Sequence, residues 1–159
     1  MSGASNKSQP VIDLLNEVLT SELTAINQYF LHAELCQHWG LSKLGKKIRM
    51  NSIGEMKHAE ELIERVLFLD GLPNVQRLGR IRIGENVTEI LESDLSLEKE
   101  AIERLTSGIK LCADANDHGS RLLLEKILAS EEEHIDWIDA QKKAIEQVGL
   151  ENYLTTQIE

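Results

Sequence analysis

Four long stretches of the 159-residue chain carry apolar residues at helical spacing, and this pattern most constrains the fold. The chain contains only 2 Pro and 10 Gly, and most of them fall before or between these stretches. In the first stretch the apolar positions are Val11, Leu14, Leu15, Val18, Leu19, Leu23, Ile26 and Phe30. The periodicity predicts helices over residues 11–39, 44–69, 87–112 and 120–148. We therefore expect an all-α protein.

The segment 72–85 separates the second and third predicted helices and has no helical period. It contains Pro73, Gly79 and Gly84, and it is long enough to run the length of a helix bundle. Short turns join the helices on either side of it. This order predicts a four-helix bundle with one long crossover, followed by a short C-terminal helix within residues 150–158. The small, polar residues 1–10 are expected to form a flexible tail, and residues 11–159 a single domain.

The charge balance is acidic, with 17 Lys+Arg against 27 Asp+Glu and a net charge of −10. Nucleic acid and anionic membranes attract positive patches, so the balance disfavours both as partners and favours cations. Cys36 and Cys112 are too few for a disulfide framework and lack zinc-ligand spacing, so we interpret them as reduced core thiols. The N-terminal segment has no apolar core of a signal peptide, and no apolar run could span a bilayer. We expect a cytoplasmic protein.

An internal repeat relates the two halves of the chain through one fixed shift of 76 residues. Aliphatic matches alone would carry little weight, because any two amphipathic helices share an apolar stripe. The ionisable matches are more specific: Glu22 with Glu98, Glu55 with Glu131, and His58 with His134. The halves are therefore predicted to be two helical hairpins related by a pseudo-two-fold axis.

The same six residues predict a two-metal site. Residues 55–58 and 131–134 are Glu-x-x-His motifs, whose two ligands lie on one helical face within about 6 Å. Glu22 and Glu98 lie on apolar stripes that carry no Lys or Arg to neutralise them. Buried carboxylates without partners are costly, and two divalent cations would balance four of them. One isolated motif would more often be a solvated helix pair, but six residues in one register match the ligand pattern known from ferritin-like di-metal bundles.

Mixed carboxylate and imidazole ligands suit iron or manganese, with iron and oxygen as the natural chemistry. We expect Glu22 and His58 on one ion and Glu98 and His134 on the other, with Glu55 and Glu131 bridging both. Tyr29 and Trp137 fall on the faces of these ligands and are candidates to support them. Ordinary core packing is the alternative for both aromatic residues.

Several longer strings resemble the bacterioferritin family over nearly the whole chain from Val11. They are LTAINQYFLH (23–32), EMKHA (55–59), IERVLFLDGLP (63–73) and EEHIDW (132–137). The resemblance implies a homo-oligomeric hollow cage of 24 subunits, possibly mixed with a paralogous subunit. It implies a ferroxidase that oxidises Fe²⁺ with O₂ or H₂O₂ at the di-iron centre and stores ferric mineral inside. A ferredoxin-like reductant for iron release is also implied.

The resemblance further implies haem b, one per two subunits, held between two symmetry-related copies of Met56. Met56 follows Glu55, so it points about 100° away from the metal face, toward a flank where another subunit could pack. A methionine on such a flank is otherwise an adaptable gap filler. The positions that match the haem pocket of the family are Leu23, Asn27, Phe30 and Ile53.

The chain departs from some relatives at Met50 and Gly54, where those relatives carry His and Asp that form a further iron site on the inner wall. Neither residue here can supply that function, so we predict that this inner site is absent. Its absence is compatible with a di-iron centre that passes iron inward as a gate, and the alternative is a centre that keeps its iron as a fixed cofactor. Arg49 stands where a Tyr near the haem is common. One alternative function is a haem-containing cage for electron transfer or stress protection with little mineralisation. An oxygenase or reductase is another, but it would need an open substrate cavity.

Overall fold

The computed structural model describes residues 8–159, so the tail predicted over residues 1–10 lies mostly outside the described residues. This part of the chain forms five helices and no strand: α1 (Gln9–His38), α2 (Ser42–Phe68), α3 (Val87–Asp114), α4 (His118–Val148) and α5 (Leu150–Thr155). The ends of the four long helices lie within two residues of their predicted positions. The predicted bundle with a long crossover and a short C-terminal helix is confirmed.

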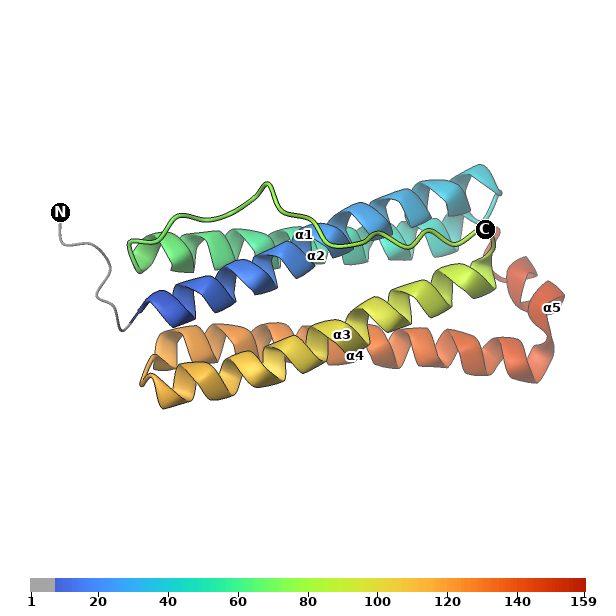
Figure 1. The fold of residues 1–159 in the computed structure, drawn as a ribbon. Helices are drawn as coiled ribbons and strands as arrows, with labels where there is room; N and C mark the ends of the chain where they lie inside the picture. Colours follow the sequence, from blue (N-terminus) through green and yellow to red (C-terminus); the bar gives the residue numbers. More distant parts are fainter. Residues whose placement is uncertain (1–7) are drawn as a thin grey trace.

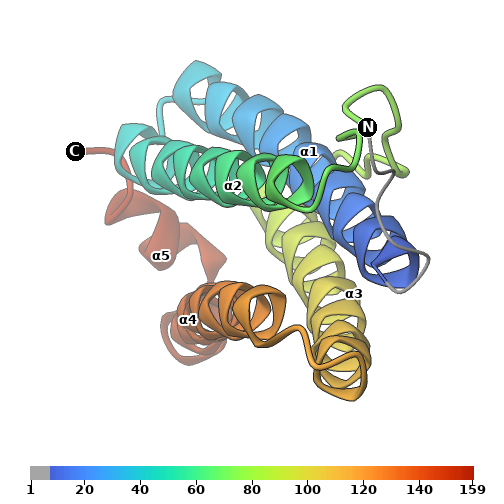
Figure 2. The same cartoon turned by 90° about the vertical axis from the view of Figure 1, so that its left-hand side faces the viewer.

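Two antiparallel hairpins, α1–α2 and α3–α4, pack against each other along their lengths (Figure 1). Gly40 has a φ of 82°, a conformation that suits glycine, at the turn between α1 and α2. The crossover, residues 69–86, returns along the bundle from the end of α2 to the start of α3. Seen from one end in Figure 2, the four helices surround a common core, and the crossover lies outside α1.

The core consists of two apolar clusters with a buried polar layer between them. One cluster holds Tyr29, Leu44, Ile90 and Tyr153, near the end of the bundle that α5 covers. The other holds Leu15, Leu62, Leu105 and Ile127, toward the opposite end. Each helix buries an apolar stripe here, as its period predicts. The polar layer between the clusters is the candidate functional site, because burying polar groups costs free energy unless they have partners.

Polar contacts fasten the first hairpin to the second half of the chain at both ends of the bundle. At one end, Arg65 donates to Asp117 Oδ1 at 2.8 Å and to Ser120 Oγ at 2.9 Å, and Asp117 also caps the start of α4. At the other end, the Lys43 N–H donates to the Gln157 carbonyl at 3.0 Å. Beside it, Ser42 Oγ donates to the Ile158 carbonyl at 2.9 Å.

Side chains of α1 hold the crossover against the bundle. Thr24 Oγ1 accepts from the Gly79 N–H at 2.8 Å, and Gln28 Oε1 accepts from the Arg82 N–H at 3.0 Å. Gly84 then passes so close to the start of α3 that a Cβ there would lie 2.4 Å from the Ile90 nitrogen. Only glycine fits at this point.

Both cysteines are buried and unpaired, and burial raises the pKa of the Cys36 thiol to about 12. Among the helices of residues 8–159, none is both long enough and apolar enough to cross a bilayer.

Candidate metal centre

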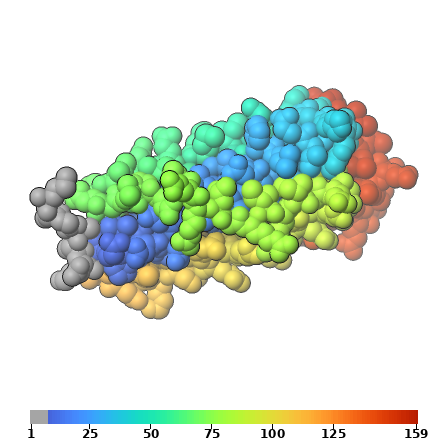
Figure 3. Space-filling view, turned by 45° about the horizontal axis from the view of Figure 1, so that its top comes forward, coloured from blue at the N-terminus to red at the C-terminus, as the bar shows by residue number. Residues whose placement is uncertain are grey.

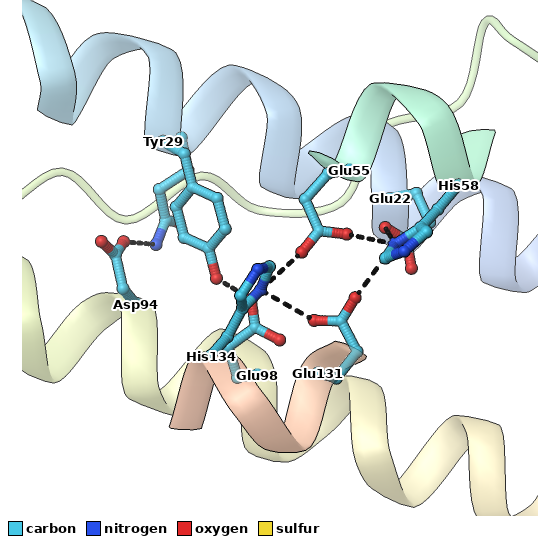
Figure 4. Close-up of polar contacts among 9 residues, drawn as sticks. Glu22, Tyr29, Glu55, His58, Asp94, Glu98, Glu131 and His134 are labelled. Carbon is cyan, nitrogen blue, oxygen red and sulfur yellow. Dashed lines mark hydrogen bonds and ion pairs between the residues drawn. The ribbon is translucent and has the colours of Figure 1, made fainter. Parts of the chain in front are cut away.

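The polar layer in the middle of the bundle contains all six of the residues singled out by the repeat. Glu22 comes from α1, Glu55 and His58 from α2, Glu98 from α3, and Glu131 and His134 from α4. The four carboxylates are almost completely buried, with at most 2% of any residue exposed. Figure 4 shows the side chains pointing toward one another from the four helices.

The two histidines occupy equivalent positions at opposite sides of the cluster. His58 Nδ1 lies 3.1 Å from Glu55, 3.4 Å from Glu131 and 3.6 Å from Glu22. His134 Nδ1 lies 3.0 Å from Glu55, 3.5 Å from Glu98 and 3.5 Å from Glu131. Each imidazole therefore faces three carboxylates through the same ring nitrogen.

The cluster divides into two groups of potential ligands that share two members. One group is Glu22, Glu55, His58 and Glu131, and the other is Glu55, Glu98, Glu131 and His134. Within each group, one ligand atom per residue lies within 4.8 Å of all the others. Glu55 and Glu131 belong to both groups, so their carboxylates stand between two potential ion positions.

The residues fit two divalent cations because the protein alone leaves buried polar atoms unsatisfied. Despite the charge contacts above, five atoms lack a well-aligned hydrogen bond: Glu22 Oε2, Glu55 Oε1, Glu98 Oε2, Glu131 Oε1 and His134 Nδ1. Buried polar atoms in native proteins are nearly always partnered. Oxygen and imidazole donors without a thiolate are typical of iron or manganese sites.

Without a cation, protons bound to the glutamates and histidines balance the negative charge of the cluster. Burial raises the pKa of Glu22 and of Glu98 well above the usual range, and the nearby carboxylates raise both further. Burial alone would lower the pKa of His58 and His134, but hydrogen bonds to the surrounding carboxylates outweigh it and raise both to about 12. Burial also opposes ionisation of Glu131, yet hydrogen bonds from Glu98 and the histidines lower its pKa.

The two aromatic candidates differ in their relation to the cluster. The Tyr29 hydroxyl donates a hydrogen bond to Glu98, and the Tyr29 ring meets His134 edge-on with centroids 6.4 Å apart. Trp137 is half-buried against the core, with Lys47 Nζ 5.6 Å from its ring centroid. Tyr29 therefore contacts the cluster directly, whereas the contacts of Trp137 are those of core packing.

A second buried polar group, which the sequence analysis did not anticipate, lies beside the cluster. His32 Nδ1 contacts Asp94 Oδ1 at 2.8 Å, and Gln28 donates to the same oxygen at 2.9 Å. His32 Nε2 accepts from the Gly84 N–H, so the ring proton is on Nδ1 and points at Asp94. Burial raises the pKa of Asp94, against the effect of these hydrogen bonds. Asp94 lies four residues before Glu98, and this i, i+4 spacing was the available signal.

Met56 lies outside the cluster, on the surface of α2, and is 56% exposed. Two of the residues that match the haem pocket of the family, Phe30 and Ile53, are also exposed. The guanidinium of Arg49 stacks 5.6 Å from the centroid of the Phe30 ring. Large apolar side chains are thus exposed on both helices of the first hairpin.

The four-helix fold is that of a ferritin-like domain, and the family model of this domain matches residues 12–148. The chain is 52% identical to the bacterioferritin of Streptomyces coelicolor over 94% of its length and 89% of that protein. It is 50% identical to the bacterioferritin of Mycobacterium leprae over 90% of each chain, and 43% identical to that of Brucella melitensis over 92% of each. The chain belongs to the bacterioferritin family.

Proposed function

We propose that this protein stores iron and that the six-residue cluster is a ferroxidase centre that oxidises Fe²⁺. The observation that carries the proposal is the pair of ligand groups that share Glu55 and Glu131. Two shared carboxylates suit two ions held side by side. A pair of Fe²⁺ ions can together supply the two electrons that O₂ or H₂O₂ accepts. Membership of the bacterioferritin family supports iron as the metal.

In this proposal each hairpin holds one Fe²⁺ substrate ion. Glu22 and His58 bind one ion, Glu98 and His134 bind the other, and Glu55 and Glu131 bridge them. Imidazole binds a metal through an unprotonated nitrogen, so the histidines release their Nδ1 protons when the ions enter. The Tyr29 hydroxyl holds Glu98 in its ligating orientation.

The oxidation balances when two Fe²⁺ each lose one electron. The electron pair reduces H₂O₂ to two water molecules with the uptake of two protons, or O₂ to H₂O₂ with the same uptake. The buried carboxylates favour the ferric product because they supply four negative charges in a site from which water is nearly excluded.

Aerobic addition of Fe²⁺ to the purified protein tests the proposal. We expect ferric absorbance to form much faster than in buffer alone, at two Fe²⁺ per subunit in the first turnover. A rate equal to that of buffer would contradict the ferroxidase function and would favour the alternative, a haem-containing cage for electron transfer or stress protection with little mineralisation.

We also propose a cytoplasmic cage of 24 subunits with haem b between pairs of subunits, bound through Met56. The exposed Met56, Phe30 and Ile53 support this, because apolar surface on a soluble protein favours a partner. Size in solution and the haem spectrum of the purified protein test it. Met56→Ala should abolish haem binding without loss of the assembly, whereas Met50→Ala, which changes another exposed methionine of α2, should keep the haem. A monomer would contradict the cage.

The inner wall is proposed to lack a further iron site, so that the centre passes iron inward. Met50 is exposed and offers only a thioether, a poor ligand for Fe²⁺, and Gly54 offers no side chain. Iron is expected to leave the cluster when Fe²⁺ is exhausted. Crystals soaked in Fe²⁺ check this, and iron bound between residues 50 and 54 would contradict it. A ferredoxin-like protein is proposed as the reductant for iron release.

A further inference from the structure

The crossover carries positive charge without negative charge, in contrast to the acidic chain as a whole. Residues 72–84 include Arg77, Arg80 and Arg82 but no Asp or Glu, whereas the whole chain has a net charge of −10. Figure 3 shows this segment on the molecular surface between α1 and α3. The segment therefore forms a basic strip on a background that repels anions.

A cavity of about 180 Å³ opens beneath this strip, between α1, the crossover and α3. Its lining includes Arg77 and Arg80 from the crossover, Arg104 from α3, and Thr20 and Ser21 from α1. At about 30 Å³ per water molecule, the space holds several waters or one small tetrahedral anion.

The three arginines that line the cavity have no carboxylate partner. In the part of the chain that the structure describes, no carboxylate oxygen lies within 4.0 Å of Arg77, Arg80 or Arg104, although six other cations form such pairs with carboxylates: Arg49, Arg65, Arg82, Lys110, Arg121 and Lys126. Three guanidinium groups around one space repel each other unless an anion lies between them.

The acidic residues of the cavity do not cancel this charge. Glu100 already accepts from Arg82 at 3.0 Å, which leaves Glu17 as the one carboxylate of the lining without such a pair. The local balance is thus three positive charges against one negative charge. Guanidinium groups bind tetrahedral oxyanions through paired N–H donors. The Thr20 hydroxyl already donates to the Asn16 carbonyl at 3.1 Å, so Ser21 is the neighbouring hydroxyl that can add a hydrogen bond.

We propose that this cavity binds a divalent oxyanion of the phosphate class. The anion would accept hydrogen bonds from Arg77, Arg80 and Arg104, and its charge would offset their mutual repulsion. It would also join the crossover to α3. The site is distinct from the six-residue cluster and shares no residue with it.

Calorimetric titration of inorganic phosphate into the assembled, iron-free protein at constant ionic strength tests this proposal. Iron is removed so that phosphate cannot bind ferric mineral. We expect saturable binding that Arg80→Ala and Arg104→Ala each weaken about tenfold, which matches the loss of one charged hydrogen bond. Glu17→Gln should strengthen binding about two- to fivefold by removing the opposing carboxylate.

Arg121→Ala is the matched control, because Arg121 pairs with Glu125 on α4 outside the cavity. It should leave phosphate binding unchanged. A sugar phosphate titrated in parallel distinguishes free phosphate from the phosphoryl group of a larger ligand: arginine-dependent binding of either supports the proposal. Absence of binding, or binding that the cavity variants and Arg121→Ala alter equally, would overturn it. The assembly size of each variant shows that the comparison is made on folded protein.

Discussion

The two hairpins each contribute two Glu and one His to the buried cluster, but the surroundings of these residues differ. Glu98, in the second hairpin, accepts a hydrogen bond from the Tyr29 hydroxyl. The position that the 76-residue shift pairs with Tyr29 is Leu105, which is buried in an apolar cluster. The repeat thus preserves the groups that form the cluster and not the groups behind them. We infer that the two ion positions differ in affinity although their ligands match.

The largest effect is expected from removing ligands of the second hairpin. Glu98→Ala with Glu131→Ala takes one ligand from its own ion and one bridge from both ions. Rapid Fe²⁺ oxidation should fall to the rate of buffer while the assembly persists, as stopped-flow absorbance and size measurements would show. Glu92→Ala with Glu133→Ala is the matched control, because these two glutamates lie exposed on the same helices. A surviving rate in the first variant would mean that the ligands are assigned wrongly.

Removing the hydroxyl that distinguishes the hairpins should weaken one ion position alone. Tyr29→Phe deletes the donor to Glu98, and loss of such a supporting hydrogen bond lowers metal affinity about 10–100-fold. Titration with Co²⁺, which is not oxidised under these conditions, should show one weakened step and one unchanged step. Tyr153→Phe removes a hydroxyl that donates to Gln141, away from the cluster, and should alter neither step. Equal weakening of both steps would refute the inequivalence of the hairpins.

Both hairpins should release protons when cations bind. The pKa of His58 and of His134 is raised to about 12, so both imidazoles are protonated at pH 7 without metal. A cation binds the unprotonated form, so at least two protons should leave per pair of ions, and affinity should rise with pH. The raised pKa of Glu22 and Glu98 adds to the release. A pH indicator in weakly buffered solution measures this on Zn²⁺ addition, and an affinity independent of pH would contradict it.

The smallest effect is expected at the helix starts, where the hairpins also differ. The Asn86 side chain accepts from the Glu89 N–H at the start of α3, whereas Ser8 makes no such bond at the start of α1. Asn86→Ala should cost about 1 kcal/mol and lower the Tm of the metal-free protein by about 2–4 °C. Ser8→Ala should leave the Tm unchanged in the same thermal scan. Equal shifts would mean that capping does not distinguish the hairpins.

The sequence predicted the helices and the proximity of the six residues. Both predictions depend on the helical spacing of apolar residues, which can be seen locally in the sequence. Glu22 and Glu98 lie on apolar stripes, so a bundle has to bury them together with the Glu-x-x-His motifs. That they bind iron stays a prediction. The His32 and Asp94 contact was not foreseen, because it depends on how α1 packs against α3 and is absent from the repeat. The arginine cavity also depends on the path of the crossover, which has no periodicity to predict it.

The fastenings at the two ends of the bundle have a consequence for how fast ions enter and leave. Arg65 with Asp117 joins the two hairpins at one end, and Lys43 with Gln157 joins the first hairpin to the C-terminal segment at the other. Parting the helices would break both sets of contacts and take microseconds to milliseconds, as collective motions do. The side chains of His58 and His134 are 10% and 14% exposed, so each ring reaches the edge of the cluster. We therefore expect the rotation of these two histidine rings to set the rate at which ions enter and leave the cluster, without movement of the backbone.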